Sequence, residues 1–128
     1  MTKLRKVALT VLLGLSALPA QAQKPMIGVT DTEIKIGQSA PFSGPASVYG
    51  QISTAESDYF KMINEQGGIN GRKINLIAVD DGYSPPKSIE VVRRLIEEDQ
   101  VAILFQTIGT APNAAIRHYI NQAEKKPN

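Results

Sequence analysis

The sequence predicts an α/β fold in three layers, with a mostly parallel β-sheet and crossover helices on its faces. Three times along the chain, an apolar strand-like run is followed by a polar loop and then by a segment with apolar residues at helical spacing. Parallel strands need crossover connections of this kind, so the alternation is typical of a parallel sheet. Residues 23–128 are long enough for one such domain with a modest core.

The N-terminus has the organisation of a secretory signal peptide. Three basic residues precede an apolar run at 7–18, and the small-residue pattern Ala20-Gln21-Ala22 follows it. The run is shorter than the roughly 20 residues that span a bilayer. We expect cleavage after Ala22 and a periplasmic location. Because the sequence contains no cysteine, we expect neither a disulfide nor a lipid anchor at the cleavage site.

Charge and composition argue against several classes of partner. Residues 1–22 hold three of the 14 basic residues and none of the 12 acidic residues, so the rest of the chain has 11 basic and 12 acidic residues. This balance gives no reason to expect binding to nucleic acid. The absence of cysteine excludes a cysteine-rich zinc site, and the single His118 makes a histidine-based metal site implausible. No glycine-rich phosphate-binding motif predicts a cofactor.

The first half of the chain predicts strand, helix and strand. Residues 33–40, EIKIGQSA, read as a strand, and from Gly50 apolar residues recur at helical spacing up to Gly67-Gly68, which can cap the helix. Asn70-Gly71 predicts a tight turn. Residues 73–80, KINLIAVD, are so continuously apolar that we expect a strand buried on both faces.

The second half repeats the pattern. Ser84 is placed to cap a helix that starts at the following prolines. Residues 101–106, VAILFQ, predict a third strand, and residues 115–123 predict a helix with one apolar stripe. The predicted inward positions of these two helices are Ile89, Val92, Leu95, Ile96, Ala115, Ile116, Tyr119, Ile120 and Ala123.

Uncharged hydrogen-bonding side chains gather in the loops that follow the predicted strands. In an open parallel sheet the ligand crevice lies beyond the carboxyl ends of the strands, next to helix N-termini. Such an edge suits a carboxylate or another small polar anion. The loop residues are Ser43, Ser47, Tyr49, Ser84, Thr107 and Thr110. The alternative is that residues 43–45 form only a turn and Ser47 only a helix cap.

Asp80 and Asp81, at the end of the second predicted strand, have two interpretations. Adjacent acids at this position can hold magnesium or accept a phosphoryl group. They can also bind loop amides and favour the N-terminus of the next helix, which is the interpretation we prefer because consecutive strand residues point to opposite faces. No nucleophile motif indicates an enzyme.

Three segments stand out in this order along the chain, namely IKIGQSAPFSGPASVYG, INEQGGINGRKINLIAVDDGYSPPKS and LFQTIGTAPNAAIRHYIN. Together they resemble the leucine/isoleucine/valine-binding family of periplasmic solute-binding proteins. The resemblance implies the first lobe of a type I periplasmic binding fold, with an ABC permease as partner and a small amino-acid-like or amide solute as ligand. It implies that Ser43 and Tyr49 border the ligand and that Thr107 binds its carboxylate, with Thr110 nearby.

Members of this family run to several hundred residues, so the resemblance implies that residues 23–128 are a partial N-terminal lobe. Two other interpretations stay open. One is an exported enzyme or phosphoacceptor domain that uses Asp80 and Asp81, and the other is a fragment with no independent function.

Overall fold

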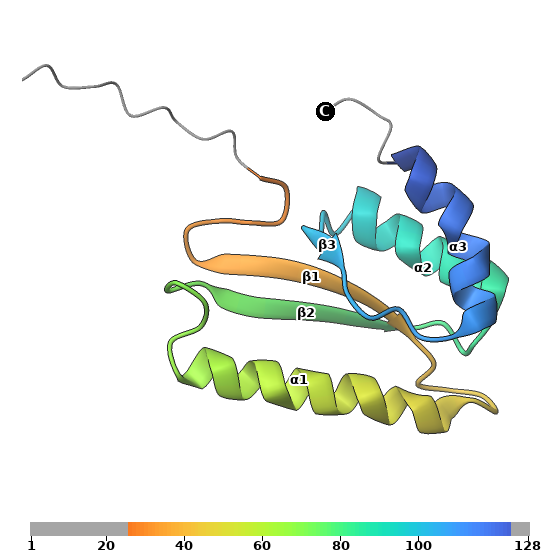
Figure 1. The fold of residues 1–128 in the computed structure, drawn as a ribbon, viewed down its shortest axis with the longest axis horizontal. Coiled ribbons are helices and arrows are strands. Elements are labelled where there is room, and N and C mark those ends of the chain that lie inside the picture. The colour runs from red at the N-terminus through yellow and green to blue at the C-terminus, as the bar shows by residue number, and fades with distance from the viewer. Residues whose placement is uncertain (1–25, 124–128) are drawn as a thin grey trace, which may run out of the picture.

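The computed structural model describes residues 26–123, which form a three-stranded parallel sheet with helices on both faces (Figure 1). The predicted signal peptide and the predicted cleavage site after Ala22 lie outside these residues. Within them, no helix is long and apolar enough to cross a membrane. The elements in chain order are β1 (Glu33–Ala40), η1 (Ser47–Tyr49), α1 (Gly50–Glu65), β2 (Lys73–Asp80), α2 (Pro85–Glu97), β3 (Ile103–Leu104) and α3 (Thr110–Ala123).

The central strand of the sheet is β1, and the strand order is β2-β1-β3. Its pairing with β2 runs from Glu33 opposite Lys73 to Ala40 opposite Asp80. The chain thus turns to one side of β1 through α1 and to the other side through α2 (Figure 1). This reversal creates a topological switch point between β1 and β3, where ligands bind in open α/β sheets.

Alternation along β1 divides its side chains between the two helical layers. Gln38 faces α1, where its Nε2 donates to Glu56 Oε2 at 2.6 Å. Gly37 and Ser39 face α2. A Cβ added at Gly37 would lie 3.1 Å from the Val101 side chain, so the glycine allows close packing between this helix layer and the sheet.

The apolar core lies mainly between the sheet and α2. It consists of Val91, Leu95 and Val101, against which Ile77, Val79 and Leu104 pack. Predicted inward positions on α2 and α3 agree with this arrangement, since Val92, Leu95 and Ile116 are buried. On α1 the apolar stripe is less covered, and Ile52 and Tyr59 are exposed.

Two predictions about the strands are wrong. The third strand covers only Ile103–Leu104, because Gln100 and Gln106 adopt left-handed backbone conformations with φ of 52° and 47°. The strand β2 is half-buried with Lys73 and Asn75 exposed, because it forms an edge of the described sheet.

The two turns predicted at Gly67-Gly68 and Asn70-Gly71 are present in the structure. Asn70 and Gly71 have φ of 50° and 79°, and the Arg72 N–H donates to the Ile69 carbonyl at 3.0 Å. Gly67 and Gly68 also have positive φ and follow α1, with the Gly68 N–H donating to the Ile63 carbonyl at 3.0 Å.

We predict that Gly68→Ala destabilises the fold more than Gly67→Ala. A Cβ at Gly68 would lie 2.1 Å from the Arg72 carbonyl oxygen, whereas nothing lies within 4 Å of a Cβ at Gly67. Both positions have positive φ, so both substitutions carry a cost of about 1 kcal/mol or more, and the difference between them reports the backbone clash. Urea unfolding of both variants measures it, and equal midpoints would contradict the clash.

Candidate functional site

The carboxyl ends of the three strands meet at one edge of the sheet, and their loops surround a cavity of about 370 Å³. Tyr49 approaches it from the end of the β1 loop and Tyr83 from the β2 loop. Four residues come from the loop after β3 and the start of α3, namely Ile108, Gly109, Thr110 and Asn113. None of these six residues is charged, and the volume is within the range of small-molecule pockets.

Asp80 holds the loop after β1 in place. Its Oδ1 accepts hydrogen bonds from the backbone N–H groups of Phe42 at 2.9 Å and Ser43 at 3.1 Å, and from Gly82 at 3.0 Å. Its Oδ2 accepts from Ser43 Oγ at 2.6 Å and from Lys87 Nζ at 3.1 Å. One carboxylate therefore joins two of the three loops at the edge.

These donors stabilise the ionised form of Asp80. The hydrogen bond from the Ser43 hydroxyl is the largest cause that lowers the pKa of the Asp80 carboxyl well below its usual range. Burial opposes the shift, while the Gly82 amide, Lys87 and the Ser43 amide reinforce it. The carboxylate therefore stays charged over the whole physiological range.

Asp81 is buried completely and connects the sheet to α2. Its Oδ2 accepts from Ser39 Oγ at 2.7 Å and from Ser88 Oγ at 2.8 Å, and its Oδ1 accepts from the Tyr83 N–H at 2.8 Å. The two aspartates thus point to different surroundings. Neither pairs with the other as a magnesium site or phosphoacceptor would require, and no group of three or more potential metal-ligating side chains occurs in residues 26–123.

Of the four predicted ligand residues, the structure brings Tyr49 and Thr110 to the same cavity. Tyr49 is 53% exposed and so has a free ring face. Ser43 lies in the same loop as Tyr49, but its hydroxyl donates to Asp80. Ligand contact by these residues remains a prediction.

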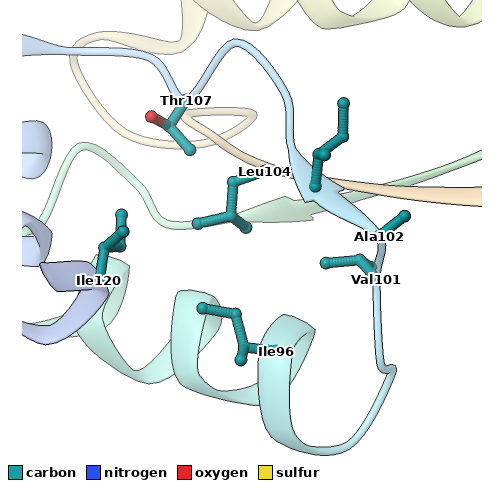
Figure 2. Close-up of a pocket in the computed structure, with 7 residues that line it drawn as sticks. Ile96, Val101, Ala102, Leu104, Thr107 and Ile120 are labelled. Atoms are coloured by element: carbon teal, nitrogen blue, oxygen red, sulfur yellow. The ribbon is translucent and has the colours of Figure 1, made fainter. Parts of the chain in front are cut away.

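Thr107 lines a different hollow, although its hydroxyl is bonded to Asn113 of the first cavity. It borders an apolar groove of about 540 Å³ between β3, α2 and α3, together with residues that include Leu104 and Ile120 (Figure 2). Its Oγ1 donates to Asn113 Oδ1. Asn113 in turn donates from Nδ2 to the carbonyls of Thr107 at 2.9 Å and Gly109 at 2.8 Å, which closes the loop before α3.

Sequence reasoning did not single out Tyr83, Ile108, Gly109 or Asn113 as cavity residues. Two signals were present. Tyr83 directly follows Gly82 in a loop expected at the ligand edge, and Asn113 lies in the first turn of a helix, where asparagine commonly binds nearby backbone groups. Ser84 occupies the predicted cap position of α2, yet its side chain makes no capping hydrogen bond.

We predict that Asp80→Asn lowers the free energy of unfolding at neutral pH by about 1–3 kcal/mol, because the amide nitrogen cannot accept the bonds from Ser43 and Lys87. The folded-state pKa of Asp80 lies below the ordinary value of 3.8, so the stabilisation is complete above that value and is lost as the pH falls below it.

Urea unfolding of both proteins between pH 7 and pH 2 measures this difference. It should be largest at neutral pH and shrink in the acid range. Asp58→Asn, at an exposed position on α1, provides the control. A difference that stays constant with pH would contradict the role of the carboxylate charge.

Comparison with known proteins places this architecture among bacterial binding proteins. The family model described as "Periplasmic binding protein" matches residues 33–126. An "Amino acid binding protein" of Pseudomonas aeruginosa is 35% identical over 88 residues, which are 66% of this chain and 24% of that protein. The "Leu/Ile/Val-binding protein homolog 7" of Brucella abortus is 34% identical over 97 residues, which are 75% of this chain and 24% of that protein.

Among solved structures, a substrate-binding periplasmic protein from Ralstonia solanacearum superposes with a TM-score of 0.66 at 34% identity. The match covers 72% of this chain and 26% of that one. The chain therefore spans about a quarter of the length of the relatives that it matches.

Proposed function

Because this chain belongs to the periplasmic binding protein family, of the Leu/Ile/Val-binding type, we propose that it supplies part of the solute-binding component of an ABC importer. The solute would be an amino acid, branched-chain amino acids included, or a related small carboxylate or amide. The family is a solute-binding family and not an enzyme family. Residues 23–128 would form part of the first lobe, and the remaining length of such receptors would supply the other cavity walls.

The observation that carries this proposal is the cavity at the switch point between β1 and β3. It is uncharged, of suitable volume, and formed by loops from all three strands. Its lining combines two aromatic side chains, those of Tyr49 and Tyr83, with the polar side chains of Thr110 and Asn113. A small solute with an apolar group and a polar head matches this combination.

The polar head would lie at the beginning of α3. The first residue of this helix is Thr110, which also borders the cavity. The first turn of a helix leaves N–H groups without helical partners and carries a partial positive charge, so a carboxylate is favoured there. Thr110 would add a hydroxyl donor.

The location and the partner follow from the same premise. A periplasmic receptor must be exported, which accords with the basic and apolar N-terminus and with cleavage after Ala22. Its partner would be the permease of an ABC transporter in the inner membrane.

We predict that Tyr49→Ala weakens binding of the solute by about tenfold, because truncating a ring that the solute covers forfeits roughly 1.5 kcal/mol or more of apolar burial. Saturation-transfer NMR and titration calorimetry with L-leucine, L-isoleucine, L-valine, L-phenylalanine and benzoate measure binding. The purified chain must first show a cooperative thermal transition. If it does not, the interpretation of the chain as a fragment with no independent function is favoured.

Tyr59→Ala is the matched control. Tyr59 is 56% exposed, close to the 53% of Tyr49, but it lies on α1 away from the cavity. Equal loss of binding in both variants would point to non-specific contact with exposed tyrosines. Absence of binding to every probe by the unmodified chain would refute the proposed solute class.

A further inference from the structure

Tyr83 is held in an uncommon conformation at the cavity. Its φ of 61° lies in the left-handed region, which a bulky residue rarely adopts and which costs energy. Its N–H donates to the buried carboxylate of Asp81 at 2.8 Å, so the backbone is fixed by the same network that joins β1 to α2. A strained backbone at a residue that lines a cavity suggests that the side chain has a role there.

The Tyr83 ring lies directly against the backbone of Gly109. A Cβ added at Gly109 would lie 2.5 Å from Tyr83 Cε2 and 3.0 Å from two ring atoms of Pro112. The Gly109 carbonyl accepts from the backbone N–H of Asn113 at 3.0 Å and from its Nδ2 at 2.8 Å, so Gly109 is itself anchored to α3. The missing side chain at position 109 therefore makes the space in which the ring lies.

The cavity consequently has two tyrosines that come from different loops. Tyr49 and Tyr83 both line it, and in the described part of the chain their rings make no ring–ring contact. Tyr49 is largely exposed, whereas Tyr83 is partly buried against Gly109. The Tyr49 ring is thus exposed, whereas the Tyr83 ring is held against Gly109. The cavity of about 370 Å³ that both residues line therefore has one aromatic ring already in position.

From this arrangement we propose that Tyr83, positioned by Gly109, determines the specificity of the cavity, and that it favours a small carboxylate with an aromatic side group over one with a branched aliphatic group. This inference rests on the proposed solute-binding function and narrows its solute class. Aromatic rings gain more from packing on another ring than their buried area alone provides. Because none of the lining residues is charged, a solute whose side group carries a charge would bury that charge without a partner and is disfavoured.

The test compares benzoate and L-phenylalanine with L-leucine, using titration and saturation-transfer NMR on the full chain. Tyr83→Leu should weaken binding of the aromatic probes by about three- to tenfold and leave L-leucine within about twofold. Tyr83→Phe, which keeps the ring, should bind all three probes as the unmodified chain does. Gly109→Ala should act like Tyr83→Leu, because the methyl group displaces the ring.

Tyr83→Gly separates binding from folding. Glycine accepts a φ of 61° without strain, so the urea midpoint should stay level or rise while the preference for aromatic probes disappears. Tyr59→Leu provides a matched aromatic control outside the cavity.

The outcomes distinguish this inference from the function on which it rests. If the chain binds a probe and Tyr49→Ala weakens that binding, but Tyr83→Leu and Tyr83→Gly keep the selectivity, the role of Tyr83 is refuted and the binding function stands. If L-leucine binds more tightly than both aromatic probes, the proposed solute class of the cavity is wrong. If no probe binds, both proposals fail.

Discussion

The buried carboxylate of Asp81 is the interaction on which the geometry of this edge depends. It accepts hydrogen bonds from a β1 side chain, an α2 side chain and a loop amide, and it is excluded from solvent. A buried charge is costly unless its hydrogen-bonding capacity is filled, so the three donors must stay in position together. The sheet, the helix above it and the loop at the cavity are consequently held in one arrangement.

Asp80 extends this arrangement outward to the neighbouring loop. Asp80 and Asp81 are adjacent in sequence but have different partners, because Asp80 binds loop groups and Lys87, whereas Asp81 is buried against Ser39 and Ser88. Asp80 joins the loop after β1 to the loop after β2, and its partner groups include Ser43. The serine, glycine and proline residues that follow β1 therefore have a structural role in the loop. Gly44, for example, has a φ of 79°, and a Cβ there would lie 3.3 Å from the Gly82 carbonyl oxygen.

Sequence patterns predict those parts of the fold that depend on local periodicity. The strands at 33–40 and 73–80 and the start of α1 at Gly50 are confirmed at their predicted bounds, as are the parallel α/β class and the family. The length of β3 was not predictable in this way, because its ends are set by left-handed residues and not by polarity. Local periodicity also does not predict that Thr107 borders an apolar groove and binds Asn113 six residues further along. Its contact with a ligand stays a prediction.

Backbone conformation accounts for the rest of the site. Left-handed residues occur in each of the three loops that follow the strands, at Gly44, Gly82, Tyr83, Gln106 and Gly109. Most natural substitutions at such positions carry a steric or strain cost, so these loops can change their side chains less freely than the surface helices can. Tyr83 and Gln106 are the two members of this set that are not glycine, and at both positions a glycine would adopt the same backbone conformation at lower strain. At position 83 the backbone conformation favours glycine, whereas the tyrosine side chain borders the cavity and packs against Gly109, so its contacts are the reason we give for a tyrosine there.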